Sequence, residues 1–319
     1  MNRRTTAGLA VLALVALGLA GCSGGDTSGA AKGGDATYAV VTHGAAGDAF
    51  WDVVKKGAQK AGEDLGVKVT YQGSGKPEEQ ADLINAAIGD KVDGIVVSMA
   101  NPDAVSDPIR KAIDADIPVI TINSGQAESS KLGALSHVGQ DETVAGEGAG
   151  EKLAGAGVKK LLCVVHEAGN IGLEQRCSGA ESTLDGKMVN LQVDINNIAE
   201  AQSTIASKLQ ADASIDGVLA LNPAIGVAAT EAVSTAGSKA KVATFDLSAD
   251  VINAVSQGTI LFAVDQQQYL QGYLPITMLN LYRTNANTVG GGKPVLTGPG
   301  FVTKDNADKV KDLAGAGTR

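Results

Sequence analysis

Aromatic residues and cationic charge are both scarce in this sequence. Phe, Trp and Tyr make up 3% of the 319 residues, and there is a single tryptophan. Lys and Arg total 26 against 35 Asp and Glu, which gives a formal net charge of −9. Binding to nucleic acid depends on Lys and Arg that meet phosphates. The composition therefore argues against a nucleic-acid partner.

Signatures of catalysis and metal binding are also missing. The three histidines are scattered, whereas a zinc site needs several ligands at characteristic spacings. The sequence contains neither the dinucleotide fingerprint Gly-x-Gly-x-x-Gly nor the phosphate loop Gly-x-x-x-x-Gly-Lys-[Ser/Thr]. It also contains no nucleophile elbow Gly-x-Ser-x-Gly after residue 36. Gly146, Gly148 and Gly150 lie in a predicted helix and lack the third glycine of a dinucleotide fingerprint. We therefore expect no catalytic residue, no metal and no cofactor, and the chain is not predicted to be an enzyme.

The N-terminus is typical of an exported lipoprotein. Arg3 and Arg4 precede an apolar stretch at 9–19 that is too short for a confident membrane span. This stretch ends in Leu19-Ala20-Gly21-Cys22, which matches the bacterial lipobox, where the peptide is cut before a cysteine that receives a lipid. The alternative is ordinary secretion with an unmodified thiol.

The leader predicts where the mature chain works. Residues 1–21 are the predicted signal peptide, and 22–36, rich in Gly, Ser, Asp and Thr, form a flexible tether. Several acyl chains on Cys22 anchor a soluble domain stably. We therefore expect an extracytoplasmic protein that is held at the cell membrane through this lipid alone.

Two further cysteines, Cys163 and Cys177, follow in the chain. An exported protein matures where disulfides can form. A bridge between them would join a predicted strand to the helix that follows it. The alternative is a pair of separate buried thiols, and neither cysteine is predicted to be catalytic.

After residue 36, short apolar strands alternate with helices. The first strand covers 39–41, the next helix covers 50–65, and the pattern continues to a last strong helix at 268–283. A more polar strand is expected near 191–195. This alternation predicts an α/β fold with doubly wound parallel sheets and right-handed crossovers.

The pattern contains an internal repeat. At one constant offset, Val40-Val41-Thr42-His43 falls on Cys163-Val164-Val165-His166, Val92 falls on Ile215, and Val119 falls on Val242. Three strands keep the same offset, so the chain is predicted to form two similar α/β lobes. Two lobes that face each other across their strand ends would enclose a cleft.

Candidate ligand-binding residues lie where the predicted strands end, because ligands of open α/β sheets bind beyond the carboxyl ends of strands. They combine flat aromatic faces with side chains that make several hydrogen bonds, which suits the hydroxyls and C–H face of a sugar or polyol. These residues are Asp48, Phe50, Trp51, Asn123, Arg176, Asn222, Asp246 and Gln266.

Other interpretations remain open for several of these residues. Phe50 and Trp51 also fit a hydrophobic core, Asp48 and Asn222 also fit simple helix caps, and Arg176 also fits a surface ion pair. His43 and His166 occupy equivalent strand ends, and each either contacts a ligand or packs within its loop.

From Tyr38 to near the C-terminus, the sequence resembles the type I periplasmic-binding-protein family, the sugar-binding subunits of ABC importers related to ribose-binding proteins. Together the motifs are specific, although each alone is weak. They are Phe50-Trp51, Ile117-Pro118-Val119-Ile120 leading to Asn123, Val138-Gly139-Gln140-Asp141, Arg176-Cys177-Ser178-Gly179, Asn222, Phe245-Asp246, and Asp265-Gln266 with Gln271-Gly272.

The resemblance implies two Rossmann-like lobes joined by three hinge crossings. The N-terminal lobe would comprise 37–138 plus 266–291, and the C-terminal lobe 139–265 plus 292–319. The crossings would lie near 136–141, 264–266 and 290–296. The same resemblance implies ligand contacts at the eight candidate residues, permease subunits as partners, and a monomer.

Two departures from the ribose-type pattern bear on the ligand. Asp48 replaces a usual Asn, and Asn123-Ser124 replaces a usual Asp-Arg. Ribose, another pentose, a hexose and a linear polyol therefore all remain candidates. The missing cationic group disfavours an anionic ligand, because a buried charge must be paired. The alternatives are a nucleoside-binding lipoprotein, a sugar receptor for a signalling kinase, a repressor core of the same fold and an extracellular hydrolase.

Overall fold

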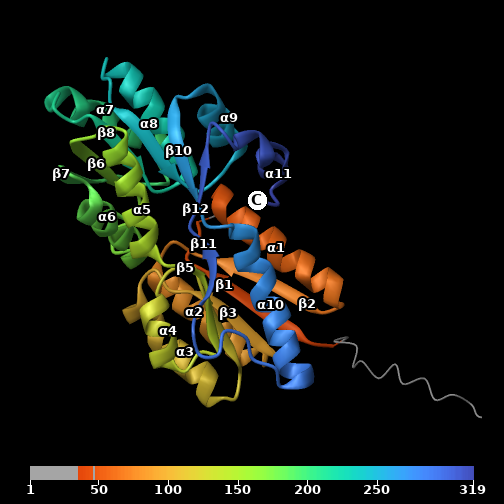
Figure 1. Ribbon diagram of the computed structural model, residues 1–319. Helices are drawn as coiled ribbons and strands as arrows, with labels where there is room; N and C mark the ends of the chain where they lie inside the picture. Colours follow the sequence, from red (N-terminus) through yellow and green to blue (C-terminus); the bar gives the residue numbers. More distant parts are fainter. Residues whose placement is uncertain (1–34, 46) are drawn as a thin grey trace, which may run out of the picture. The chain divides into compact units, whose positions relative to one another are not determined.

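A computed structural model describes residues 35–45 and 47–319. The predicted signal peptide, Cys22 and most of the tether lie outside the described residues. The described chain forms two six-stranded sheets (Figure 1). None of the described helices is long and apolar enough to cross a membrane.

The first sheet, sheet A, has the strand order β11-β5-β4-β3-β1-β2, and every strand pair in it is parallel. The elements of this lobe are β1 (Thr37–Thr42), α1 (Ala49–Leu65), β2 (Lys68–Gly73), α2 (Pro77–Gly89), β3 (Gly94–Ser98), α3 (Pro102–Asp114), β4 (Val119–Ile122), α4 (Gln126–Leu132), β5 (Ser136–Gln140), α10 (Gln268–Asn285) and β11 (Val295–Gly298). Helices α1 and α10 pack side by side on this lobe (Figure 1).

The second sheet, sheet B, repeats this order as β12-β10-β9-β8-β6-β7, with only β12 antiparallel to its neighbour. Its lobe consists of α5 (Glu142–Gly155), β6 (Lys160–Val165), α6 (Ile171–Thr183), β7 (Lys187–Gln192), α7 (Ile198–Ala211), β8 (Gly217–Ala220), α8 (Pro223–Thr235), β9 (Lys241–Phe245), α9 (Ala249–Gln257), β10 (Ile260–Asp265), β12 (Gly300–Thr303), a 3₁₀ turn (Ala307–Lys309) and α11 (Lys311–Ala316).

Helices cover both faces of each sheet, because the central strands are apolar on both sides. In β1, Tyr38 and Val40 join one core cluster with residues of α1 and α10, whereas Ala39 and Val41 join another with residues of α2 and α3. Such strands are typical of parallel sheets that are buried on both faces. The predicted architecture of two doubly wound lobes is confirmed.

Strand pairing corrects two details of the predicted organisation. The segment 292–298 was predicted to belong to the C-terminal lobe, but β11 pairs with β5 and so extends sheet A. The chain crosses between the sheets at 140–142, 265–268 and 298–300, so the last crossing lies after the predicted 290–296. The other lobe bounds stay predictions.

A third correction concerns the polar strand of the second lobe. It was predicted near 191–195, whereas β7 ends at Gln192. The chain instead turns at 195–196, where the Asp194 carboxylate accepts from the backbone N–H of Asn196. Such Asx turns end strands because the side chain takes over a backbone partner.

Cys163 in β6 and Cys177 in α6 form a disulfide, as predicted, with a Cα–Cα distance of 6.0 Å and a sequence separation of 14. Both residues are almost completely buried. The bridge closes a short loop, and the chain-entropy model assigns such a loop about 3 kcal/mol of stabilisation. It fixes α6, the helix that carries Arg176, to strand β6 of sheet B.

Helix α6 is also held by close packing against α5. A Cβ atom added to Gly146 of α5 would collide with the backbone carbonyl of Arg176. The same holds for Gly179 of α6, whose added Cβ would collide with the carbonyl of Thr143. Because Gly146 and Gly179 have no side chain, the backbones of α5 and α6 can approach closely.

Candidate functional site

All eight candidate residues and both histidines line one cavity between the strand ends of the two sheets. Five further residues line it as well, namely Ser124, Glu167, Asn170, Leu173 and Leu221. We call this space the inner cavity. Its volume is about 30 Å³, which is room for only a few water molecules. A ligand therefore enters only when the two walls move apart.

An aromatic wall forms one side of the inner cavity. Phe50 and Trp51 lie at the start of α1 with their ring centroids 4.9 Å apart in an edge-to-face arrangement. Trp51 makes a second edge contact with His43, at 4.7 Å. Both aromatic residues also belong to the core cluster under α1. The two sequence interpretations therefore hold together: these rings are core residues that expose part of their surface to the cavity.

Asn123 and Asp246 occupy equivalent positions in the two lobes, each directly after a strand. Both adopt left-handed backbone conformations, with φ of 62° and 69°. Asn and Asp tolerate this conformation better than most residues, and backbone strain of this kind collects at functional sites. The internal repeat thus extends to the backbone geometry of the cavity.

Gln266 links these two residues across the second crossing. Its Oε1 accepts from Asn123 Nδ2 at 3.0 Å, and its Nε2 donates to Asp246 Oδ1 at 2.7 Å. Gln271 Nε2 adds a bond to the same Oε1 at 2.8 Å. Because all of these amides are buried and mutually satisfied, the network fixes the orientation of the side chains at the floor of the cavity.

Arg176 is buried, not a surface residue, with 4% of its surface exposed. Its Nε and Nη2 donate to the two oxygens of Glu142 at 2.6 and 3.0 Å, and Nη1 donates to the Leu221 carbonyl at 3.2 Å. Nη1 also lies 3.8 Å from Asp246 Oδ2, and the guanidinium lies over the Phe245 ring at 4.6 Å. A buried cation with two carboxylate neighbours leaves no excess positive charge for an anionic ligand.

Asp48 and Asn222 are helix caps as well as cavity residues. Asp48 Oδ1 accepts from the Phe50 N–H at 2.9 Å, and Asn222 Oδ1 accepts from the Ala224 N–H at 2.8 Å. Their remaining polar atoms approach each other across the cavity, with Asn222 Nδ2 3.5 Å from Asp48 Oδ2. This distance is at the limit of a hydrogen bond, so a ligand can replace the contact at little cost.

The carboxyl groups of Asp48 and Asp246 both have pKa values above their ordinary range. Burial raises the pKa of Asp48 to about 6, although the backbone N–H of Phe50 lowers it. Burial likewise raises the pKa of Asp246 to about 7, against the lowering effect of Arg176. Hydrogen bonds donated by ligand hydroxyls would favour the ionised forms.

His43 and His166 sit where the repeat predicts and line the inner cavity, His43 after β1 and His166 after β6. Burial lowers the pKa of His43 to about 3 and that of His166 to about 4, so both rings are neutral near pH 7. His43 Nδ1 bonds Ser98 Oγ at 2.7 Å. His166 Nδ1 is buried without a hydrogen-bond partner among the described residues.

Sequence reasoning missed Glu167 and Asn170, which line the inner cavity, and Glu142, the buried ion-pair partner of Arg176. Asn170 Nδ2 donates to Glu167 Oε2 at 2.7 Å, and Glu167 Oε2 lies 3.8 Å from His43 Nε2 of the other lobe. Glu167 and Asn170 lie in the loop between β6 and α6, so the strand-end rule that selected His166 also covers this loop. Among the described residues, no group of three His, Cys, Asp or Glu is arranged to hold a metal ion.

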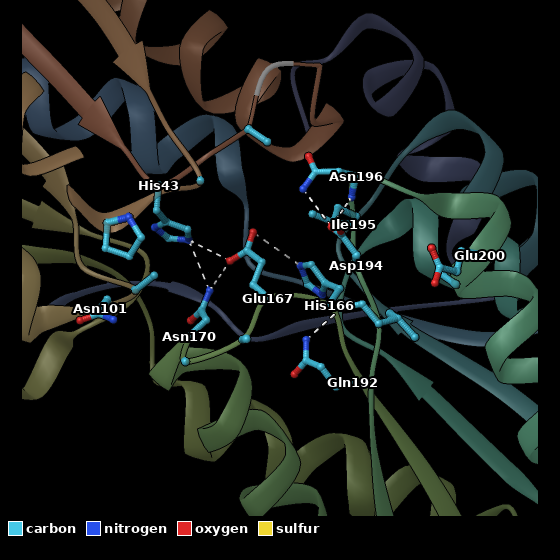
Figure 2. Close-up of a pocket in the computed structure, with 18 of the residues that line it drawn as sticks. His43, Asn101, His166, Glu167, Asn170, Gln192, Asp194, Ile195, Asn196 and Glu200 are labelled. Carbon is cyan, nitrogen blue, oxygen red and sulfur yellow. Dashed lines mark hydrogen bonds and ion pairs between the residues drawn. The ribbon is translucent and has the colours of Figure 1, made fainter. Parts of the chain in front are cut away.

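A larger cavity of about 550 Å³ opens beside the inner one, and we call it the outer chamber. Figure 2 shows His43 and Asn101 across from Gln192, Asp194, Asn196 and Glu200, with Glu167 between them. The residues that line both spaces are His43, His166, Glu167 and Asn170. The outer chamber is larger, yet the predicted residues converge on the inner cavity, where the buried polar groups are concentrated.

Comparison with known proteins agrees with this geometry. A family model described as "Periplasmic binding protein domain" matches residues 38–286. A solved carbohydrate transporter from Acidothermus cellulolyticus, in complex with myo-inositol, is 41% identical with a TM-score of 0.88, covering 89% of this chain and 100% of that one. Curated relatives include the fructose import binding protein FruE of Bifidobacterium longum, 26% identical over 284 residues, or 83% of this chain and 84% of that protein. The ribose import binding protein RbsB of Escherichia coli is 27% identical over 228 residues, or 68% and 75%.

Proposed function

The chain belongs to the periplasmic binding protein family, and we propose that it is the receptor of an ABC importer that captures a neutral sugar or a cyclitol between its lobes. The predicted family resemblance is confirmed. The relatives are sugar-binding transport proteins, and the chain is likewise a binding protein, not an enzyme. The observation that carries the proposal is the convergence of eight residues from both lobes on one cavity.

The chemistry of the inner cavity supports this ligand class. Carboxylates, amides and one guanidinium supply acceptors and donors for ring hydroxyls, and the Phe50–Trp51 wall supplies an apolar face. The solved relative in complex with myo-inositol makes a cyclitol a leading candidate alongside the pentoses, hexoses and polyols. A nucleoside is less favoured, because the aromatic rings at the cavity meet edge to face and leave no slot for a stacked base.

Ligand capture follows from the cross-lobe contacts. The two lobes meet through weak polar pairs such as Asn222–Asp48 at 3.5 Å and Asn170–His43 at 3.5 Å. A ligand that bonds both walls replaces these pairs with stronger ones and so favours the closed arrangement. We propose that the closed lobes then dock, as a monomer, on permease subunits.

A thermal-shift screen with pentoses, hexoses, myo-inositol, linear polyols, nucleosides and amino acids tests the proposal. Binding stabilises the native state by mass action, by about 2.7 kcal/mol at a ligand concentration 100 times Kd. This stabilisation raises the melting temperature. We expect shifts with one or a few sugars or cyclitols. Stabilisation by nucleosides alone would show that the ligand class is wrong.

We also propose that Cys22 carries the lipid that holds the protein at the membrane, facing away from the cytoplasm. Replacing Cys22 with alanine removes the acceptor sulfur, so most of the protein should leave the membrane fraction while ligand binding is unchanged. Cell fractionation with a ligand-binding assay on each fraction measures both. A Cys22→Ala protein that still sediments with membranes would contradict the anchor.

A further inference from the structure

The outer chamber has the size and the chemistry of a second binding site. Its volume of about 550 Å³ lies within the range of about 300–1,000 Å³ that is usual for ligand pockets. It shares His43, His166, Glu167 and Asn170 with the inner cavity, so the two spaces adjoin at these side chains. Figure 2 shows side chains of its two walls, with Glu167 and His166 between them.

The walls of the outer chamber suit hydroxyl groups. One wall comes from the first lobe and includes Gly75 and Asn101. The facing wall comes from the second lobe and carries Gln192, Asp194 and Glu200. No Lys or Arg is among the described residues that line the chamber, so a phosphate or carboxylate would lack a counter-charge. Amides and carboxylates without a cation favour a neutral donor of several hydrogen bonds.

Part of this hydrogen-bonding capacity is unused. Asp194 Oδ1 accepts from Asn196, and Glu200 Oε2 accepts from Asn197 Nδ2, but each carboxylate retains a second oxygen with lone pairs. Gln192 uses its Nε2 on the Val193 carbonyl and keeps its Oε1. At the junction with the inner cavity, His166 Nδ1 is buried without a hydrogen-bond partner among the described residues.

We propose that the cleft binds a two-ring glycoside, with one ring in the inner cavity and the second ring in the outer chamber. The glycosidic oxygen then passes the junction beside Glu167 and Asn170. Their cross-lobe contacts to His43, at 3.8 and 3.5 Å, are long enough to be displaced. This inference rests on the proposed function, because the inner ring is the sugar or cyclitol of that proposal.

Gly75 offers a way to fill the chamber without disturbing the protein. A Cβ added there has no heavy atom nearer than 4.0 Å, and the residue is not in the left-handed region. Gly75→Leu therefore places a bulky side chain at the chamber wall with little strain. Gly89→Leu is the matched control, since Gly89 ends α2, is exposed, and an added Cβ there meets no atom within 4 Å.

The experiment is calorimetric titration of the mature protein with paired probes: galactosyl-myo-inositol, sucrose, trehalose, maltose and cellobiose against their component single rings. We expect at least one two-ring probe to bind about tenfold or more tighter than its rings, which corresponds to about 1.4 kcal/mol. Gly75→Leu should remove that advantage and leave single-ring affinity within about twofold, and Gly89→Leu should match the wild type.

Two results would overturn the inference while leaving the proposed function intact. In the first, single rings bind but no two-ring probe binds more tightly. In the second, Gly75→Leu weakens single rings and glycosides equally, which would place the single ring itself in the outer chamber. If neither single rings nor glycosides bind, both the proposed function and this inference fail.

Discussion

Replacing Arg176 with alanine is expected to abolish ligand binding and to lower the free energy of unfolding by about 3–5 kcal/mol. The variant leaves Glu142, bonded to the guanidinium at 2.6 and 3.0 Å, and Asp246, 3.8 Å from it, as buried carboxylates without a cation. Equilibrium urea unfolding measures the loss of stability. Titration with the ligand from the thermal-shift screen measures the loss of binding.

A paired variant separates these two effects. Arg176→Met with Glu142→Gln removes a charge from each partner and keeps similar volumes, and replacing both members of a buried ion pair is often close to neutral for stability. This double variant should recover most of the lost free energy of unfolding and still fail to bind. If Arg176→Ala binds with wild-type affinity, the guanidinium does not contact the ligand and the inner cavity is the wrong site.

The strand ends of the cavity were predictable from sequence because a single rule governs them. Short apolar runs mark buried parallel strands, and the residue after such a strand lies at the carboxyl edge of its sheet, where ligands bind. Asn123 and Asp246 each follow such a strand, and they are separated by the constant offset of the internal repeat. Asp48 and Asn222 could be placed for another local reason, because an N-cap lies directly before the first residue of its helix.

The partner of Arg176 was not predictable by such local rules. Glu142 begins α5, directly after the first crossing between the lobes and 34 residues before Arg176, and the sequence marks it only as a first-turn carboxylate. It meets Arg176 because Gly146 lets α5 lie directly against α6. The close approach of the two helices is a tertiary contact that leaves no periodic pattern in the sequence. The role of Gly146 in packing therefore could not be recognised from the sequence.

The last crossing was misplaced for a different reason. The strand β11 has only four residues, Val-Leu-Thr-Gly, and Leu296 within it is 59% exposed. A strand at the edge of a sheet lacks the two-sided apolar burial that marks the central strands. The glycines at 290–292, which suggested a hinge, instead form a turn before β11, with left-handed φ values from 58° to 92°.

Ligand affinity is expected to rise with pH between about pH 5 and pH 8. Burial raises the pKa of Asp48 to about 6 and that of Asp246 to about 7. Ligand hydroxyls donate to the ionised carboxylates, so binding must expel the protons that these groups hold at lower pH. Calorimetric titrations in two buffers of different ionisation enthalpy should show that ligand binding releases protons at about pH 5 to 7 and releases few at pH 8. Affinity that does not change with pH would exclude both carboxylates as acceptors.

The stability of the ligand-free protein should follow the opposite trend. Because both folded-state pKa values lie above the ordinary value of 3.8, the folded state binds more protons than the unfolded state, and the free energy of unfolding should fall as pH rises from about 4 to 7. Asp48→Asn removes one of these groups and should make the ligand-free protein about 1–3 kcal/mol more stable at pH 8, a figure that allows for partial exposure of Asp48.

The control is Asp52→Asn, which removes the same charge from an exposed position of the same helix and should change stability by less than about 0.5 kcal/mol. A protein that is more stable without the Asp48 carboxylate but binds more weakly would show that the carboxylate is retained for the ligand, since its burial costs stability that the hydrogen bond of a bound hydroxyl offsets. If Asp48→Asn and Asp52→Asn behave alike, Asp48 acts only as the cap of α1.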